Sequence, residues 1–151
     1  MSRSIEITDE ARLAAIVRDA RTVAVVGMVD EPKSDRPAFR IPKTLRALGI
    51  RVIPVNPTIA ASLGETAYPD LASVPVPFDV VNVFRRSERV GPIADAILEL
   101  PPERRPRIVW LQTGIRNDGA AARLAGADIE VVQDRCLGVY ASRYRPQGSD
   151  R

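Results

Sequence analysis

The chain has 151 residues, a length that favours one ordinary domain around one hydrophobic core. It contains no histidine and a single cysteine, Cys136, which excludes a histidine-based catalytic triad, a phosphohistidine, an intrachain disulfide and a cysteine-only metal site. The basic residues behind the net charge of +3 are spread along the chain with few aromatics, which argues against a nucleic-acid surface. No apolar run reaches the ~20 residues that span a bilayer, and residues 1–6 lack the apolar core of a signal peptide. We therefore expect a cytoplasmic protein without membrane contact.

The N-terminal third predicts a helix, a strand and a second helix. Apolar residues at helical spacing indicate an amphipathic helix over 8–20. A continuous run rich in valine, 22–27, then predicts a strand that is buried on both faces. The next helix ends near Leu48. It begins either at Pro37, with a kink or a loose turn at Pro42, or at Pro42 itself.

The rest of the chain repeats this alternation. Apolar runs predict strands at 51–57, 79–84, 107–111 and 129–132, and helical spacing predicts helices at 87–100 and 117–124. Parallel strands need long crossovers, which are usually helical, so this order favours a mostly parallel sheet. We predict a single Rossmann-like, doubly wound α/β domain over 1–141, with a five-stranded sheet and helices on both faces. Residues 142–151 form a polar C-terminal tail after this domain. The chain is expected to fray beyond Tyr140.

Ligands of such sheets bind beyond the carboxyl ends of the strands, where the strand order reverses. Gly27 ends the first predicted strand, where a glycine either lets a phosphate approach the backbone or simply makes a tight turn. The polar loop and helix start that follow are basic, with Lys33, Arg36, Arg40 and Lys43. These cations suit a ligand with several phosphates, such as coenzyme A; a solvated basic surface is the alternative.

A dinucleotide site has a different signature. It requires Gly-x-Gly-x-x-Gly after the first strand and an acidic residue about 20 residues further on. Here the next glycine after Gly27 is Gly49, and the second strand ends at Asn56-Pro57 without a carboxylate. An NAD(P)-binding oxidoreductase domain is therefore the less favoured alternative.

Other side chains near the strand ends have two explanations each. Cys136 follows a strand end on the ligand side and could form a mixed disulfide with the CoA thiol, although a free cysteine is more often a buried core residue. Gln112 could hydrogen-bond the amides of a pantetheine arm or cap its own loop. Arg85 and Arg86 open a helix where cations oppose the dipole, which a nearby phosphate would explain.

The order and spacing of these segments resemble the CoA-binding domain family. The segments that carry the resemblance are Val25-Val26-Gly27, Arg36-Pro37-Ala38-Phe39-Arg40, Val52-Ile53-Pro54-Val55-Asn56-Pro57, Gly64 with Tyr68-Pro69-Asp70-Leu71, Asp79-Val80-Val81-Asn82-Val83-Phe84-Arg85, Val109-Trp110-Leu111-Gln112-Thr113-Gly114 and Asp134-Arg135-Cys136. The resemblance covers about residues 15–140. It is to the small, stand-alone bacterial and archaeal members and, more distantly, to the nucleotide-binding domain of the succinyl-CoA synthetase α subunit.

In that family the first glycine loop receives the CoA phosphates, segments after the second and third strands border the adenosine, and basic side chains hold phosphates. The resemblance implies CoA contacts at Gly27, Met28, Val29, Arg36, Arg40, Asn56, Pro57, Val83, Phe84 and Arg85. Lys33, Gln112 and Cys136 complete the predicted site. We expect a protein that binds CoA or acyl-CoA without intrinsic catalysis, with a homodimer as the default assembly. A subunit of an acyl-CoA synthetase-like assembly stays open, although the chain lacks the histidine that those ligases phosphorylate.

Overall fold

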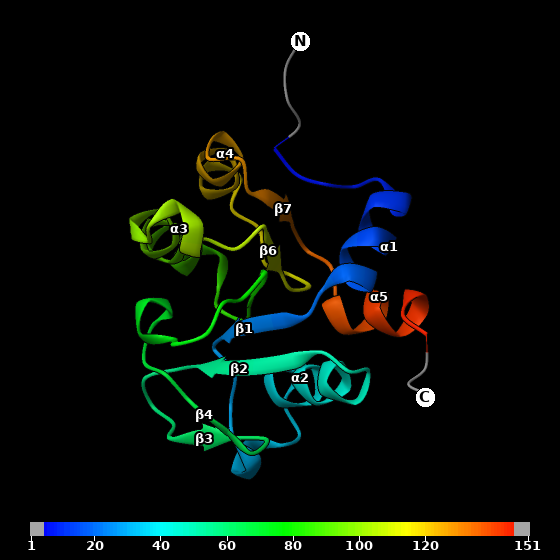
Figure 1. Ribbon diagram of the computed structural model, residues 1–151, viewed down its shortest axis with the longest axis vertical. Coiled ribbons are helices and arrows are strands. Elements are labelled where there is room, and N and C mark those ends of the chain that lie inside the picture. Colours follow the sequence, from blue (N-terminus) through cyan, green and yellow to red (C-terminus); the bar gives the residue numbers. More distant parts are fainter. Residues whose placement is uncertain (1–4, 147–151) are drawn as a thin grey trace.

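The computed structural model describes residues 5–146, which form one five-stranded sheet with surrounding helices. Its strands are β1 (Thr22–Val26), β2 (Arg51–Val55), β5 (Val80–Val83), β6 (Ile108–Leu111) and β7 (Glu130–Val132). They are ordered β2-β1-β5-β6-β7, and every neighbouring pair is parallel. The order reverses between β1 and β5, since the chain first moves outward to β2 and later outward through β6 and β7 (Figure 1). The predicted doubly wound α/β fold is confirmed.

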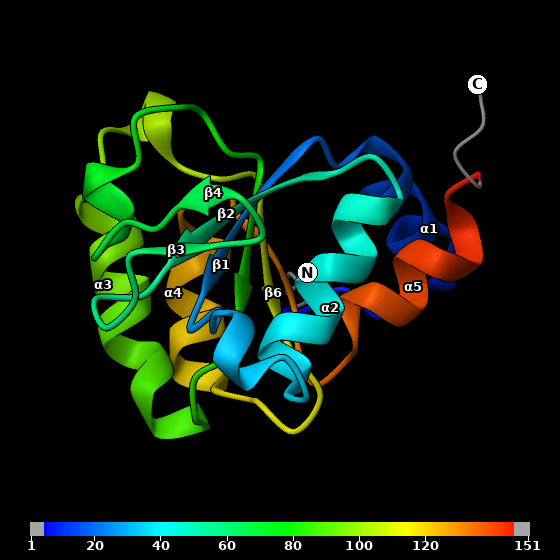
Figure 2. The ribbon, with the colours of Figure 1, turned by 90° about the horizontal axis from the view of Figure 1, so that it is seen from below.

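Helices cover both faces of the sheet (Figure 2). One face carries α1 (Glu10–Asp19), α2 (Pro37–Ala47) and α5 (Leu137–Tyr144), and the other carries α3 (Val90–Glu99) and α4 (Asp118–Gly126). In β1, Val23 and Val25 pack toward the first set while Ala24 and Val26 pack toward the second, which explains the unbroken apolar run. None of the helices within residues 5–146 has the length and apolar character that crossing a bilayer requires.

A small hairpin between β2 and β5 has no counterpart in the sequence prediction. β3 (Ala61–Ser62) and β4 (Glu65–Thr66) pair antiparallel. Leu63 and Gly64 join them with φ angles of 51° and 76°, the positive angles at both central positions that a type I′ turn requires. Short 3₁₀ turns occupy Glu31–Lys33, Leu71–Ser73, Ser87–Arg89 and Pro102–Arg104.

Pro54 lies inside β2, and the edge position of that strand explains how the sheet accepts it. The carbonyl of Pro54 accepts a hydrogen bond from the N–H of Tyr68 at 3.0 Å, on the side away from β1. The N–H and C=O of one strand residue point to the same side, so the N–H that Pro54 lacks would also face outward. The β1–β2 ladder therefore loses no hydrogen bond.

α2 begins at Pro37 and contains Pro42, so the first of the two predicted starts is the correct one. Pro42 has no N–H to donate to the carbonyl of Ala38, four residues earlier. That carbonyl instead accepts a hydrogen bond from the backbone N–H of Val29 at 3.3 Å. The proline thus leaves an acceptor that ties the loop after β1 to the first turn of α2.

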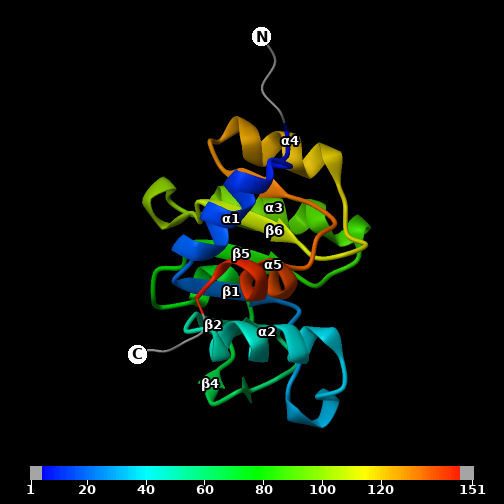
Figure 3. The same ribbon diagram turned by 90° about the vertical axis from the view of Figure 1, so that its right-hand side faces the viewer.

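α5 is the principal element that the sequence prediction missed. The chain was expected to fray beyond Tyr140, but the helix continues to Tyr144 and packs against both α1 and α2 (Figure 3). The predicted boundary between 141 and 142 therefore falls inside a helix. Residues 147–151 of the predicted tail lie outside the described residues.

Arg145, directly after α5, joins the C-terminal ends of α1 and α2. Its Nη1 donates to the carbonyls of Val17, Arg18 and Ala20 at 2.9–3.2 Å, and its Nε donates to the carbonyl of Leu48 at 3.2 Å. Burial lowers the pKa of Arg145 from its ordinary value. The negative charge of Asp79 acts in the opposite direction on this pKa, and carbonyls at the negative ends of two helices bind the positive charge of Arg145.

Arg145→Met should lower the free energy of unfolding by about 2 kcal/mol, because it removes charge-assisted hydrogen bonds and keeps an apolar stem. Arg46→Met is the matched control: Arg46 is exposed in the last turn of α2, and its side chain has no hydrogen bond to the described residues. The control should change stability by less than about 0.5 kcal/mol. Urea unfolding followed by circular dichroism measures both, and equal losses would contradict the role of Arg145.

Candidate functional site

Two cavities lie at the carboxyl ends of the strands and share one side chain, Arg85. The large cavity, of about 750 Å³, lies between the start of α2 and the loops after β5, β6 and β7. The small cavity, of about 210 Å³, lies between the ends of β1 and β2, the segment 69–71 and α3. Six predicted site residues line the large cavity, namely Arg36, Arg40, Phe84, Arg85, Gln112 and Cys136. Pro57 and Arg85 line the small one.

Gly27 lies where β1 and β5 diverge and brings their loops together. Its φ is +91°, and its N–H donates to the Val55 carbonyl at 2.9 Å. A Cβ at this position would lie 2.8 Å from the Phe84 carbonyl oxygen and 3.3 Å from Nε of Arg85. Only glycine accepts both this backbone angle and this close approach. Gly27 therefore lets Arg85 lie directly over the end of β1.

The large cavity is bordered by positive charge. Arg36, Arg40, Arg85 and Arg86 line it, and Glu88 is the one acidic side chain among the described residues of its lining. Arg36 and Arg85 form no ion pair with the described residues, and Arg86 lies 4.0 Å from the Glu88 carboxylate. Four guanidinium groups around one carboxylate favour an anionic ligand.

Three predicted site residues, Met28, Val29 and Asn56, line neither cavity, and hydrogen bonds that involve them hold the loop after β1 in place. Asn56 is buried; its Nδ2 donates to the Met28 carbonyl at 2.9 Å, and its Oδ1 accepts the N–H and hydroxyl of Thr58 at 2.9 and 2.8 Å. The Met28 side chain is buried in the core. The hydroxyl of Ser62, in β3, donates to the Val29 carbonyl at 2.8 Å. Asn56 is therefore a positioning residue in this structure.

Asn56→Ala should lower the free energy of unfolding by about 1–3 kcal/mol, because the Met28 carbonyl loses its partner and the turn loses its acceptor. Thr58→Val is the control, since it removes one hydroxyl and keeps the N–H bond to Asn56. Denaturant unfolding of both variants measures the difference. A loss for Asn56→Ala no larger than for Thr58→Val would show that the Met28 contact contributes nothing.

The remaining predicted residues lie apart from both cavities. Lys33 is exposed in a 3₁₀ turn and lines neither cavity, and the Val83 side chain is buried within β5. Glu31, whose charge would be unfavourable beside phosphates, lines neither cavity. Its Oε2 accepts the N–H of Leu63 at 2.9 Å, in the hairpin turn. The loop after β1 therefore directs this carboxylate toward the hairpin.

A buried amide network closes one end of the large cavity. Gln112 is 5 % exposed; its Oε1 accepts the N–H of Leu137 at 2.8 Å and Nδ2 of Asn82 at 3.2 Å. Asn82 Nδ2 also donates to the Trp110 carbonyl at 3.1 Å. Cys136, the N-cap residue of α5, makes no side-chain capping bond, so Gln112 supplies the cap for the first amide of that helix. Gln112 is thereby fixed beside Cys136.

Several apolar lining residues escaped the sequence reasoning. Ile41 lines the large cavity four residues after Pro37, on the same side of α2. A helix start fixed at Pro37 is the signal that would have identified it. Ile93 and Ala96 line the small cavity, where packing of α3 against the ends of β1 and β2 places them. No local sequence pattern indicates that packing.

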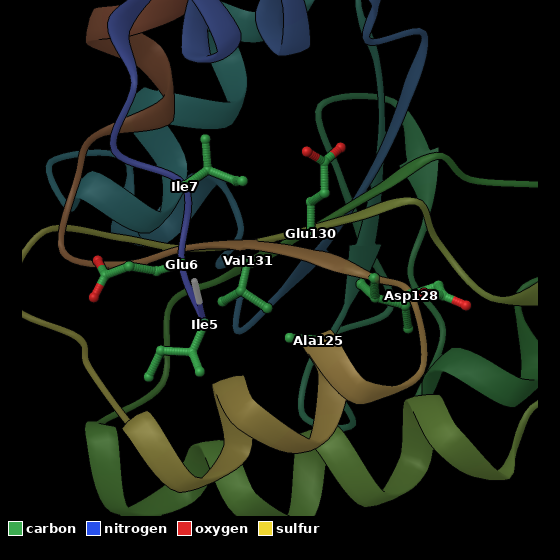
Figure 4. A pocket seen from close by; sticks show the side chains of 8 residues that line it. Ile5, Glu6, Ile7, Ala125, Asp128, Glu130 and Val131 are labelled. Carbon is green, nitrogen blue, oxygen red and sulfur yellow. The ribbon is translucent and has the colours of Figure 1, made fainter. Parts of the chain in front are cut away.

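Another hollow, of about 310 Å³, lies along the edge of β7 (Figure 4). Residues 5–7 line one side of it. Figure 4 shows the carboxylates of Glu6, Asp128 and Glu130 pointing in different directions around it, and Glu130 is paired with Arg12 of α1. Among residues 5–146, no group of three or more histidine, cysteine or acidic side chains is placed to hold a metal ion.

Residues 21–142 match the protein family described as the CoA binding domain. The chain belongs to the CoA-binding domain family. The matched range begins directly before β1 and ends within α5, so it contains the whole sheet and the lining of both cavities. The resemblance that the sequence motifs predicted is confirmed.

Three proteins that are similar to this CoA-binding domain protein have nearly the same extent. The uncharacterized protein YneT of Bacillus subtilis (strain 168) is 35% identical over 130 residues, which are 86% of this chain and 92% of YneT. A solved structure from Thermus thermophilus, cell-free ID.343, has 35% identity and a TM-score of 0.82 over 91% of this chain and 99% of that chain. A hypothetical protein from Pyrococcus horikoshii OT3 has 25% identity and a TM-score of 0.82, covering 95% and 97%.

Proposed function

We propose that this chain binds coenzyme A or its acyl thioesters at the carboxyl ends of its strands, as a binding protein and not as an enzyme. The observation that carries the proposal is the junction of two cavities of different character at Arg85. CoA joins a flat base, a cluster of phosphates and a long arm that ends in a thiol. Membership of the CoA-binding domain family supports this class of ligand.

The small cavity suits the adenine base. Its described lining is mostly aliphatic or proline, namely Val26, Val55, Pro57, Pro69, Leu71, Pro92, Ile93 and Ala96, with Asp70 and Arg85 as the charged members. The Asp70 carboxylate caps a 3₁₀ turn, because its Oδ1 accepts the N–H and hydroxyl of Ser73 at 2.9 and 2.7 Å. Apolar surfaces with few polar groups are typical of sites for aromatic ligands.

The junction of the cavities suits the phosphates. The missing Cβ of Gly27 leaves the backbone accessible beside Arg85. Arg36 is the N-cap residue of α2 and provides no side-chain capping bond, so the positive end of that helix adds to the arginine charges. Guanidinium groups bind phosphates through paired N–H donors. The accessible backbone at Gly27, the positive end of α2 and the arginine side chains together fit a pyrophosphate better than a neutral ligand.

The remainder of the large cavity suits the pantetheine arm. It extends from the arginines to Gln112 and Cys136, and its lining includes the apolar side chains Ile41 and Ile115. Its volume of about 750 Å³ lies within the range of roughly 300–1,000 Å³ for small-molecule sites. The pantetheine arm is long and carries amide groups, so it suits a channel with apolar walls and a few hydrogen-bond donors such as Gln112.

The side chains at the cavities support binding without intrinsic catalysis. The chain has no histidine to serve as a base. The hydroxyl of Ser87 accepts the N–H of Arg116 at 3.0 Å and has no carboxylate or amine partner among the described residues. Cys136 likewise has no base bonded to it within the described chain. A nucleophile paired with a base, which covalent catalysis uses, is not assembled here.

Calorimetric titration of the reduced protein with CoA, acetyl-CoA, 3′-dephospho-CoA, NAD and ATP tests the proposal. We expect CoA to bind about tenfold more tightly than 3′-dephospho-CoA, because the arginines gain a further phosphate. NAD and ATP should bind more weakly than CoA, and the CoA affinity should fall as salt increases. A preference for NAD, or no heat with CoA or acetyl-CoA, would overturn the assignment.

A further inference from the structure

We infer that Cys136 is a modification site, where a disulfide of CoA held in the large cavity exchanges with the cysteine and leaves CoA attached as a mixed disulfide. This inference rests on the proposed CoA site and adds a covalent state to it. Three sets of contacts carry it: those that hold Cys136 at the cavity, those that orient Gln112, and those that keep space beside the sulfur.

The backbone on both sides of Cys136 is fixed. Before it, the Arg135 N–H donates to the Leu111 carbonyl at 3.3 Å, and Trp110 Nε1 donates to the Arg135 carbonyl at 2.8 Å. After it, the Leu137 N–H donates to Gln112. Cys136 itself is half-buried and lines the large cavity. The cysteine is therefore presented to the cavity by a rigid frame instead of being enclosed in the core.

Gln112 gives an independent indication of a ligand at the same place. The side chain is 5 % exposed and lines the large cavity. Its Oε1 accepts hydrogen bonds from Leu137 and Asn82, and because both partners are donors, the amide oxygen and not the amide nitrogen must face them. Its Nε2 has no acceptor among the described residues. This free donor lies at the cavity wall on a side chain that is otherwise buried, and a carbonyl of the pantetheine arm would supply its acceptor close to the thiol.

Space beside the sulfur is preserved by a glycine. A Cβ at Gly138 would lie 3.1 Å from Cγ2 of Ile41 and 3.8 Å from Sγ of Cys136. The glycine thus allows α5 to approach α2 closely and keeps a side chain away from the thiol. Ile41 lines the same cavity, so the sulfur is bordered by an apolar wall.

The exchange is balanced in atoms and electrons. The Cys136 thiol gives its proton to solvent, and the thiolate attacks one sulfur of the CoA disulfide. The sulfur–sulfur bond of that disulfide breaks as the bond from Cys136 to CoA forms, and the second CoA leaves as a thiolate that takes up a proton. The CoA disulfide is the oxidant. Binding of its nucleotide near Arg85 raises the effective concentration of its sulfur at Cys136.

Intact-protein mass spectrometry of the reduced full chain tests the inference. The chain is incubated with CoA disulfide or, separately, with the small reagent 2-hydroxyethyl disulfide. We expect one CoA per chain, removed by dithiothreitol and absent from Cys136→Ser. The rate should saturate with CoA disulfide, and its second-order limit should exceed that of the small reagent by about 100-fold. Gln112→Glu keeps the acceptor for Leu137 and replaces the free donor by a carboxylate oxygen. Its charge disfavours the Cys136 thiolate toward both reagents, so the loss of the donor should appear as a CoA reaction slowed about fivefold more than that of the small reagent.

The outcomes distinguish this inference from the proposed function. If reduced CoA binds by calorimetry but CoA disulfide gives no adduct, or reacts no faster than the small reagent, the covalent state is wrong and the CoA site stands. If CoA does not bind and both disulfides react at equal rates, both conclusions fall. A CoA adduct on Cys136→Ser would also overturn the inference.

Discussion

Gly27→Ala should lower the free energy of unfolding by about 3 kcal/mol and reduce CoA affinity at least tenfold. Two effects add. An alanine at a φ of +91° is strained, and its Cβ would lie 2.8 Å from the carbonyl oxygen of Phe84. Relief of that contact requires the loops after β1 and β5 to move apart. Arg85, which follows Phe84, would then leave the junction of the two cavities.

Gly64→Ala is the matched control for this prediction. Gly64 also has a positive φ, 76°, but a Cβ there would meet nothing within 4 Å. It should therefore show only the backbone strain, about 1 kcal/mol, and unchanged CoA affinity. Urea unfolding and calorimetric titration of both variants separate strain from steric contact. Similar behaviour of the two alanine variants would mean that the approach of Gly27 to Phe84 is not required.

Arg85→Ala should weaken CoA binding by about 10- to 100-fold, equivalent to about 1.4–2.8 kcal/mol, the range expected for losing a charge-assisted hydrogen bond to phosphate. The effect is large because Arg85 is the one described side chain that lines both cavities. Arg85→Lys should recover part of the affinity, since it restores the charge without the paired donors. Stability should change little, because Arg85 forms no ion pair with the described residues.

Arg89→Ala controls for the loss of one positive charge. Arg89 lies four residues further along the chain, is exposed and lines neither cavity. Its CoA affinity should stay within about twofold of the unsubstituted protein at moderate salt. Calorimetric titration at two salt concentrations measures both variants. If Arg89→Ala weakens binding as much as Arg85→Ala, the binding energy comes from overall charge and the location of the site is wrong.

The sheet could be predicted from sequence because its causes are local. Both faces of β1 and β5 are covered, so each appears as a continuous apolar run. Helical crossovers between such runs then dictate a parallel order. The reversal of that order after β1 also placed Gly27 and Arg85 near one another, since both follow strands that are adjacent in the sheet.

Elements held by distant contacts could not be predicted in the same way. The first amide of α5 is capped by Gln112, 25 positions earlier, and Arg145 beyond the helix bonds to carbonyls near α1 and α2. Neither partner is a local helix signal. The acceptor that Pro42 leaves on Ala38 was equally hidden, because the residue that uses it, Val29, lies in a loop before the helix.

The predicted site mixed residues at the cavities with residues that support them. Strand ends identify Asn56 and Phe84 equally well, but only the structure shows that the Asn56 amide is engaged by Met28 and Thr58 while Phe84 lines the large cavity. A free cysteine is more often a core residue, and the half-buried position of Cys136 at the cavity depends on how α5 begins. The identity of the ligand contacts stays a prediction.

The hydrogen bond from Val29 to Ala38 has a consequence for the rate and energetics of association. Together with the bonds from Asn56 to Met28 and from Ser62 to Val29, it immobilises the first loop in the free protein. The loop that borders the proposed site has therefore already lost its conformational entropy during folding, and more of the contact energy of the proposed ligand would be expressed as affinity. Association at the neighbouring large cavity would then not wait for this loop to close, which favours a fast association rate.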